Sequence, residues 1–271
     1  MPVNPLYLTT AVEAVVLAGD LQMARFGQDF QINKKGTIDL VTEVDVAVER
    51  RFRALVAERF PDHQILAEEM GGAAAVPAGP CWVFDPIDGT TNFAHGLPIF
   101  CASLALEIDG VAEVGAVFDP TRQELFTAVR GGGAFMNGRP LHVSSATTLV
   151  DAMLVTGFPY DVHTRVEEIV GLFGAFVGQA RAVRRLGSAA IDLCYIAAGR
   201  MDGFWETDLH PWDIAGGALI VAEAGGLVTR TDGRPYTSRG GDVLATNRHL
   251  HDAMLEVIAT FRGGRAPKVT K

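Results

Sequence analysis

At residues 82–93 the chain reads Trp82-Val83-Phe84-Asp85-Pro86-Ile87-Asp88-Gly89-Thr90-Thr91-Asn92-Phe93, so its densest polar cluster directly follows an apolar run. The apolar run predicts a buried strand that ends at Asp85. Pro86 fixes the backbone where the strand ends, and Gly89 lets the chain turn sharply because it has no Cβ. The turn then brings backbone N–H groups together with the hydroxyls of Thr90 and Thr91. Such a turn at the start of a helix is suited to phosphate binding.

Two aspartates, Asp85 and Asp88, lie three residues apart on this turn. Carboxylates this close repel each other unless a cation lies between them. An Asx-type turn that caps a helix is the ordinary interpretation of an Asp-Gly pair, but it does not account for the whole string. The string therefore indicates a site that combines a cation with a phosphate group.

Two further acidic positions occur where predicted elements begin or end. Glu68 and Glu69 follow an apolar run, although adjacent glutamates are usually a solvated corner. Asp213 lies in the first turn of a predicted helix, where the helix dipole alone would favour a carboxylate. Oxygen donors without His or Cys favour Mg²⁺ over Zn²⁺. Several carboxylates around adjacent Mg²⁺ ions suit phosphoryl hydrolysis, because one ion activates water while another polarises the ester.

The composition excludes several classes of partner. The 271 residues include 32 Asp and Glu against 23 Lys and Arg, a formal net charge of −9. This balance argues against nucleic acid and against anionic lipid, which need a basic surface, but not against a small anionic substrate. The 3 cysteines have no metal-ligand spacing and fit a reducing compartment. We find no signal peptide and no membrane span, and we expect a cytoplasmic protein.

The predicted elements change in character along the chain. The first half has helices and then mostly antiparallel strands, including a hairpin around Asp109-Gly110 and a turn at 131–133; the second half alternates strand and helix. This order predicts an α/β protein in which two αβ layers share one body. We expect an N-terminal αβ region at 1–148, a C-terminal αβ region at 149–265 and a tail at 266–271. The helices are predicted at 6–25, 43–60, 165–178, 188–198, 211–224 and 248–261; the strands at 64–67, 81–85, 101–108, 111–118, 125–129, 152–156, 182–186, 203–205, 227–230 and 242–245; and a loop at 71–80.

Over about residues 6–260 the sequence resembles the inositol monophosphatase family of Mg²⁺-dependent, lithium-sensitive phosphatases. Four blocks carry the resemblance: residues 35–45 (Lys35-Gly36-Thr37-Ile38-Asp39-Leu40-Val41-Thr42-Glu43-Val44-Asp45), Ala67-Glu68-Glu69, residues 82–93, and Trp205-Glu206 with Trp212-Asp213-Ile214-Ala215-Gly216. Many relatives read Gly-Glu-Glu where this chain has Ala67-Glu68-Glu69, a change that keeps both carboxylates. The resemblance implies a layered αβαβα sandwich and a homodimer.

The resemblance also implies a role for each acidic residue. It assigns Glu68, Asp85 and the backbone carbonyl of Ile87 to a first metal ion. It assigns Asp85, Asp88 and Asp213 to a second ion, with Asp85 bridging the two. A third, weaker ion in the family uses Glu68 and waters, so we expect two to three Mg²⁺ ions.

The remaining implied roles concern water and substrate. Thr90, hydrogen-bonded to Asp45, resembles the relay that orients and deprotonates the attacking water beside Glu68; a Thr hydroxyl is too weak a base without a carboxylate behind it. Arg184 and Arg185 lie just before the substrate-side turn, and we interpret them as a solvated or interface pair. The residues implied to contact substrate are Asp88, Gly89, Thr90, Thr91, Ala189, Glu206 and Asp213.

We therefore predict a Mg²⁺-dependent phosphomonoesterase that acts on a small polyol phosphate, with inositol 1-phosphate the leading substrate. Within the same class, the alternatives are fructose-1,6-bisphosphatase, histidinol-phosphate phosphatase and adenosine 3′,5′-bisphosphate nucleotidase activity. Outside it, the alternative is a regulatory, transcription-associated protein on the same fold. Such a protein would be expected to have lost part of the metal set, whereas this chain keeps Glu68, Asp85, Asp88, Thr90 and Asp213.

Overall fold

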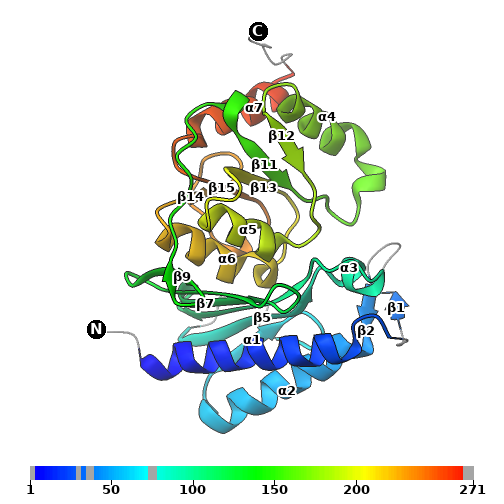
Figure 1. Ribbon diagram of the computed structural model, residues 1–271, viewed down its shortest axis with the longest axis vertical. Coiled ribbons are helices and arrows are strands. Elements are labelled where there is room, and N and C mark those ends of the chain that lie inside the picture. The colour runs from blue at the N-terminus through cyan, green and yellow to red at the C-terminus, as the bar shows by residue number, and fades with distance from the viewer. Residues whose placement is uncertain (1–3, 29–31, 35–39, 73–77, 265–271) are drawn as a thin grey trace.

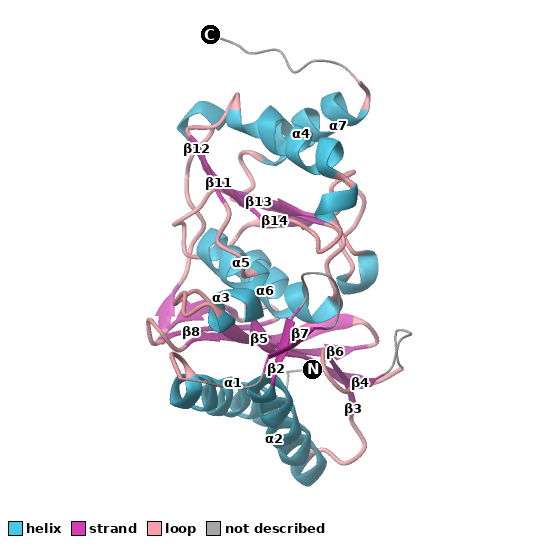
Figure 2. Ribbon diagram, turned by 90° about the vertical axis from the view of Figure 1, so that its right-hand side faces the viewer, coloured by secondary structure: helices cyan, strands magenta, loops and turns pink. Residues whose placement is uncertain are grey.

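Helices and two β-sheets alternate in five layers along the long axis of the molecule, as Figure 2 shows. The structure, a computed structural model, describes residues 4–28, 32–34, 40–72 and 78–264, the side chains of 32–34 excepted. From one end to the other, the layers are a helix pair, a sheet, a second helix pair, a second sheet and a third helix pair (Figure 1). This arrangement confirms the predicted αβαβα sandwich.

Two helices, α1 (Pro5–Arg25) and α2 (Glu43–Arg59), form the first layer, as their apolar spacing predicts. The helix α2 begins with a capping box, in which the Thr42 hydroxyl accepts from the amide of Asp45 and the Asp45 carboxylate accepts from the amide of Thr42. Before it lies a small ribbon of β1 (Ile32–Lys34) and β2 (Leu40–Thr42). The first part of the first family block, residues 35–39, lies outside the described residues.

The first sheet has the strand order β10-β9-β8-β7-β6-β5-β3-β4, in which only β3 and β5 pair in parallel. It confirms the predicted hairpins but adds a short strand, β4, where we expected only loop. Gly72 makes this pairing possible, because a Cβ there would lie 2.0 Å from the carbonyl oxygen of Ile65. The strands are β3 (Gln64–Ala67), β4 (Gly71–Gly72), β5 (Pro80–Asp88), β6 (Cys101–Ile108), β7 (Val111–Asp119), β8 (Glu124–Val129), β9 (Gly133–Met136) and β10 (Arg139–Pro140).

The strand β5 directs the side chain of Asp85 toward the middle helix layer. Trp82 and Phe84 pack into the core beneath α1 and α2, whereas Val83 packs with Ala215 of the middle layer. Successive side chains of a strand point to opposite faces, so Asp85 continues the face of Val83. The pairing with β6 then shifts between Asp85 and Asp88, and this irregularity ends the regular strand at the predicted turn.

The second sheet, with the order β12-β11-β13-β15-β14, lies between the middle helices α5 and α6 and the outer helices α4 and α7. Each strand of this sheet and each of these four helices lies within a few residues of its predicted range. The strands are β11 (Met153–Thr156), β12 (Ala182–Arg184), β13 (Gly203–Glu206), β14 (Leu227–Thr229) and β15 (Val243–Thr246). The helices are α4 (Val166–Val177), α5 (Ala189–Ala197), α6 (Pro211–Glu223) and α7 (His251–Arg262), with 3₁₀ turns at Leu149–Asp151, Val162–Thr164 and Ser238–Gly240.

The helix α6 lies unusually close to the first sheet. A Cβ on Gly115 of β7 would lie 2.8 Å from the carbonyl oxygen of Gly216, and a Cβ on Gly216 would lie 2.8 Å from that of Leu104. The Ser103 hydroxyl also donates to the backbone carbonyl of Trp212 at 3.3 Å. Close backbone packing therefore holds the start of α6, which carries Asp213, against β6 next to β5.

The boundary expected at 148/149 separates the two sheets in the sequence, but it does not separate the layers in space. The helices α5 and α6 belong to the second half of the chain, yet they pack on the first sheet (Figure 1). The expected tail lies outside the described residues. Among the described helices, none combines the length and apolar character that a membrane span requires.

His251, at the start of α7, is a buried imidazole with two threonine partners. The Thr229 hydroxyl donates to the carbonyl of Arg230, so its oxygen is free to accept from Nε2–H of His251 at 2.9 Å. The Thr246 hydroxyl lies 3.0 Å from Nδ1, which accepts from it in the neutral ring. Burial lowers the pKa of His251, Asp252 opposes this shift and Arg248 adds to it.

We predict that this neutral histidine makes folding stability depend on pH. Because the folded-state pKa lies below the usual value of 6.5, the stabilisation is complete above that pH and is lost as pH falls through the folded-state pKa. The melting temperature of wild type should fall more steeply between pH 7.5 and 5 than that of His251→Gln, about the window of an unperturbed imidazole. Glutamine keeps a donor and an acceptor but does not titrate, so parallel pH profiles for the two proteins would contradict the assignment.

Candidate active site

A cleft opens where the end of β5 meets the starts of α5 and α6. Its empty volume, open solvent at the mouth included, is about 1070 Å³. The cleft brings together most of the residues to which the sequence assigned substrate or metal contacts: Asp88, Gly89, Thr90, Thr91, Ala189, Glu206 and Asp213 all line it. Three elements distant in the sequence therefore supply one pocket.

The three aspartates of this site share one bonding pattern. Each has one carboxylate oxygen held by protein donors, while the other accepts no hydrogen bond from the described residues. Asp85 accepts from the amide of Ile87 at 2.9 Å. Asp88 Oδ2 accepts from the Ser188 hydroxyl at 2.6 Å and from the amide of Ala190 at 2.7 Å, and Asp213 Oδ2 accepts from the amide of His210 at 2.7 Å. The protein thus fixes each carboxylate and leaves one oxygen of each available.

Burial and mutual repulsion disfavour the charged form of all three carboxylates. Burial raises the pKa of Asp85 well above its usual value, and repulsion from Glu68, Asp88, Asp213 and Asp45 raises it further. Burial likewise raises the pKa of Asp213 well above its usual value, with Asp88 and Glu68 adding to the shift. Burial raises the pKa of Asp88 to about 6, although the bonds from Ser188 and Ala190 oppose this shift. A divalent cation among these groups would reverse the sign of their environment.

Glu68 follows β3, and a buried carboxylate holds the turn that carries it. The Oε2 atom of Glu49, on α2, accepts from the amide of Glu69 at 2.8 Å, and its Oε1 atom accepts from the amide of Met70 at 3.0 Å. Arg53, one turn along the helix, bonds Glu49 Oε1 at 2.8 Å. Glu49 therefore fixes, from α2, the turn that carries Glu68. The sequence did not reveal these contacts.

The Thr90 hydroxyl lies between two acceptors. Its Oγ1 atom is 2.8 Å from the carbonyl oxygen of Ile87 and 3.4 Å from Oδ1 of Asp45. One hydroxyl proton serves one acceptor at a time, so in this structure the bond to Ile87 is the shorter one. The other oxygen of Asp45 is held by the amide of Thr42 at 2.8 Å. The helix cap of α2 thus also places Asp45 within reach of Thr90.

The predicted turn at Gly89 has the left-handed backbone that glycine favours, with φ of 92°. A Cβ there would lie 2.9 Å from the carbonyl oxygen of Ile99. The short helix α3 (Thr90–Ala94) follows, and the side-chain amide of Asn92 donates to the carbonyls of Ile99 and Leu186 at 2.8 Å each. Asn92 thereby joins this turn to the connection that leads into α5.

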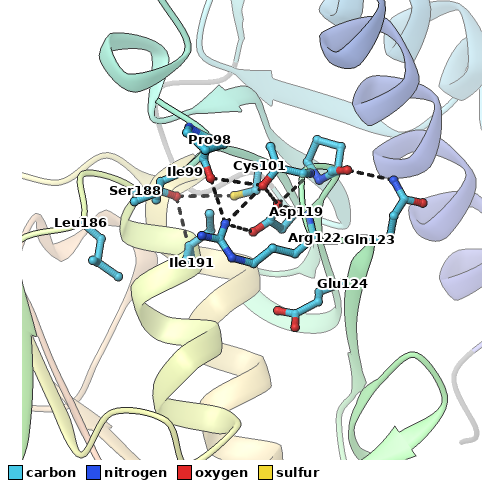
Figure 3. Close-up of polar contacts among 12 residues, drawn as sticks. Pro98, Ile99, Cys101, Asp119, Arg122, Gln123, Glu124, Leu186, Ser188 and Ile191 are labelled. Carbon is cyan, nitrogen blue, oxygen red and sulfur yellow. Dashed lines mark hydrogen bonds and ion pairs between the residues drawn. The ribbon is translucent and has the colours of Figure 1, made fainter. Parts of the chain in front are cut away.

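Ser188, just before α5, joins that helix to β6 through its contact with Cys101, as Figure 3 shows. Its hydroxyl, which donates to Asp88, lies 3.6 Å from the sulfur of Cys101 and accepts from the amide of Ile191 at 3.4 Å. Nearby, Arg122 donates to the carbonyl of Pro98 at 2.9 Å and pairs with Asp119 at 3.0 Å. These contacts anchor the segment before β6.

Glu206, at the end of β13, is buried and accepts no hydrogen bond from the described residues. Burial raises its pKa to about 8, Arg185 opposes the shift and Asp88 adds to it. The carboxylate lies so close to Gly157 that a Cβ there would meet its oxygens at 2.1 Å, so any other residue at this position would displace the carboxylate. Asp192, one turn into α5, is also buried, and both its oxygens lack a partner among the described residues.

The donor set fits Mg²⁺ in chemistry. The donors are carboxylates, each with one of its two oxygens held by protein donors, and the nearby carbonyl oxygen of Ile87. These are the hard ligands that this ion prefers. Their spacing is not that of a closed site, because no group of three His, Cys, Asp or Glu side chains within the described ranges converges closely enough to hold an ion. Repulsion among uncompensated carboxylates is consistent with this spacing.

Sequence reasoning missed the contacts that support this site. Asn92 lies in the polar string at 82–93, but its bond to Leu186, like the bonds of Ser188 and Glu49, joins positions 20 to 100 residues apart, and Gly157 acts through crowding against the Glu206 side chain. The cap position of Ser188 before α5 was visible from the predicted helix, but its bond to Asp88 was not.

A model of the inositol monophosphatase family matches residues 5–261. The chain is 44% identical to an inositol-1-monophosphatase of Synechocystis, over 97% of this chain and 94% of the relative. It is 42% identical to a protein of Pseudomonas aeruginosa named Nus factor SuhB, over 93% and 95% of the two chains. The structure of an inositol monophosphatase from Anabaena (Nostoc) matches with a TM-score of 0.86 at 38% identity, covering 94% of this chain and 96% of that one.

Members of this family are phosphatases that depend on a metal ion, generally Mg²⁺. The match extends over nearly the whole chain, and it agrees with the five-layer fold and with the oxygen donors of the cleft. The chain belongs to the inositol monophosphatase family.

Proposed function

We propose that this chain hydrolyses a small polyol phosphate in a Mg²⁺-dependent reaction, with inositol 1-phosphate the leading substrate. The observation that carries the proposal is a set of three aspartates, the buried Asp85 and Asp88 and the half-buried Asp213, each with one oxygen fixed by the protein and the other without a hydrogen bond from the described residues. Structural carboxylates normally satisfy both oxygens or lie in solvent. Three that do neither, beside a cleft, fit a cation-dependent reaction.

We assign two to three Mg²⁺ ions to the residues around these aspartates. Glu68, Asp85 and the carbonyl of Ile87 would hold the first, and Asp85, Asp88 and Asp213 the second; Glu68 would also serve a third, weaker ion. Bound Mg²⁺ supplies positive charge for the phosphate and makes a water molecule more acidic.

The chain's own residues would then orient water and move its proton. Glu68 and the Thr90 hydroxyl position the water for in-line attack on phosphorus. Thr90 accepts the proton of the water while its own proton passes to Asp45, whose Oδ1 atom lies 3.4 Å away. The bond from the water oxygen to phosphorus forms as the ester bond between phosphorus and the polyol oxygen breaks, so no covalent phospho-enzyme is needed. The leaving polyol oxygen takes a proton from solvent water, and the proton held by Asp45 returns to solvent.

The substrate would lie between two walls of the cleft. The turn at Gly89, Thr90 and Thr91 offers backbone N–H groups for the phosphate. Ala189 and Glu206 also line the cleft, and the Glu206 carboxylate, which accepts no hydrogen bond from the described residues, would accept one from a polyol hydroxyl.

A regulatory role without catalysis is the second candidate, because a relative of 42% identity is named Nus factor SuhB. The intact set of Glu68, Asp85, Asp88, Thr90 and Asp213 favours catalysis. We also propose a homodimer, the assembly that the family resemblance implies.

We predict that Asp213→Asn lowers Mg²⁺-dependent turnover more than about 100-fold, because the free carboxylate oxygen is the proposed ligand. Asparagine can still accept the amide of His210, so the melting temperature should stay close to wild type. Asp208→Asn is the matched control. It lines the same cleft but pairs with Arg165 at 2.6 Å, and it should retain turnover. Near-normal turnover in Asp213→Asn, measured against Mg²⁺ concentration, would overturn the ligand assignment.

We further expect inositol 1-phosphate to give the highest kcat/KM among four phosphoesters, by about tenfold. The others are fructose 1,6-bisphosphate, histidinol phosphate and adenosine 3′,5′-bisphosphate. All turnover should stop when Mg²⁺ is chelated and return when it is restored. A higher kcat/KM on another ester would reassign the substrate but not the chemistry, whereas turnover that survives chelation would contradict the metal dependence.

A further inference from the structure

Arg185 lies on the wall of the cleft, unlike its neighbour. Its guanidinium carbon is 5.8 Å from the ring centroid of Phe158, and a Cβ on Gly187 would lie 2.7 Å from its Nη1 atom. Arg184, in contrast, does not line the cleft and donates to the carbonyl of Val183 at 3.2 Å. The structure therefore separates two residues that the sequence grouped as one solvated or interface pair.

The charges around the cleft leave Arg185 without a match. Among the described residues that line it, Arg185 is the one arginine or lysine, against Asp88, Glu206, Asp208 and Asp213. Asp208 is paired with Arg165 outside the lining, and Asp88 and Asp213 belong to the proposed cation site. Glu206 remains as the acidic group that faces Arg185.

Arg185 and Glu206 interact electrostatically, although the two side chains form no ion pair within the described residues. Arg185 stabilises the charged form of Glu206 and also that of the buried Asp192, yet among the described residues no ion pair joins Arg185 to Glu206. The guanidinium donates no hydrogen bond to the described residues, and the carboxylate accepts none. A buried acceptor and a guanidinium that is exposed to the solvent of the cleft thus line the same cleft, separated by a gap that no ion pair among the described residues closes.

The gap suits a group that both donates and accepts. A hydroxyl can donate to Glu206 and accept from Arg185, and two adjacent hydroxyls can use both more fully. A phosphate dianion offers only acceptors, so Arg185 would attract it and the Glu206 carboxylate would repel it. We propose that Arg185 determines specificity by pairing with Glu206 across this gap to bind hydroxyls of the polyol leaving group. The inference rests on the proposed function and adds a residue that recognises the leaving group.

The test compares a polyol ester with an ester whose leaving group has no free hydroxyl. We would measure kcat and KM for inositol 1-phosphate and for 4-nitrophenyl phosphate at saturating Mg²⁺. Arg185→Ala should raise KM for inositol 1-phosphate about tenfold and leave kcat within about twofold, because one charge-assisted hydrogen bond is lost. Values for 4-nitrophenyl phosphate should not change. Arg185→Lys should recover part of the loss, since lysine restores the charge but not the fork.

Arg184→Ala is the matched control, because it removes the same charge from the neighbouring position outside the cleft. An equal loss on both esters in Arg185→Ala would assign the guanidinium to the reacting phosphate and overturn the proposal, as would unchanged kinetics. A loss confined to fructose 1,6-bisphosphate would instead assign it to a second anionic group. Arg185→Ala could instead change the oligomeric state and raise KM in parallel, with Arg185→Lys restoring both. That result would assign the guanidinium to a subunit interface and overturn the proposal.

Binding of free inositol, measured by calorimetry, separates this proposal from the proposed function. If wild type hydrolyses neither ester, the proposed function fails. The role of Arg185 would still be supported if Arg185→Ala binds inositol about tenfold more weakly than wild type, and overturned if the two bind equally.

Discussion

Repulsion among buried carboxylates is the constraint on which the site depends. Asp85 and Asp88 lie at the end of β5 and Asp213 at the start of α6, and burial makes their charged forms costly. Within the part of the chain that the structure describes, no arginine or lysine pairs with them to relieve this cost. Instead the fold ties one oxygen of each to a backbone amide or to Ser188, which fixes the carboxylates while leaving their charge uncompensated. The charged carboxylates thereby lower the stability of the folded protein, and they form a site that a bound cation would complete.

Holding three such groups together requires a stiff frame, and close backbone packing provides it. The helix α6 approaches the first sheet at Gly115 and Gly216 more closely than a residue with a Cβ would allow. This contact sets the position of Asp213 relative to β5, because a helix packed backbone to backbone cannot shift without a clash. The glycines of this interface therefore belong to the chemistry of the site, although they touch no ligand.

The sequence predicted the layers and the polar turn well because both depend on local patterns. Strand alternation through Trp82 and Val83, the cap at Thr42 and the glycine at Gly89 each follow from a few neighbouring residues. The sequence could not predict the bond from Ser188 to Asp88, which joins positions 100 residues apart. Nor could it separate Arg184 from Arg185, because only the packing of the β12–α5 connection against Phe158 decides which side chain reaches the cleft. The Gly71-Gly72 pairing was missed for a related reason: glycine is typical of loops, and only the approach of Ile65 shows why it lies in a strand.

The acidic residues of the cleft differ in their role from the acidic excess of the chain as a whole. The net charge of −9 disfavours polyanionic partners, but it does not describe the cleft. There, Asp85, Asp88 and Asp213 form a group whose sign a divalent cation reverses, so that a phosphate is attracted only once the cation is bound. Glu206, also on the wall of the cleft, lies outside this group, and Arg185 opposes the effect of burial on it without cancelling that effect. This environment suits the uncharged hydroxyls that we propose it binds. An acidic protein can therefore bind an anionic ester, because its two kinds of acidic group face the two chemically different ends of that ester.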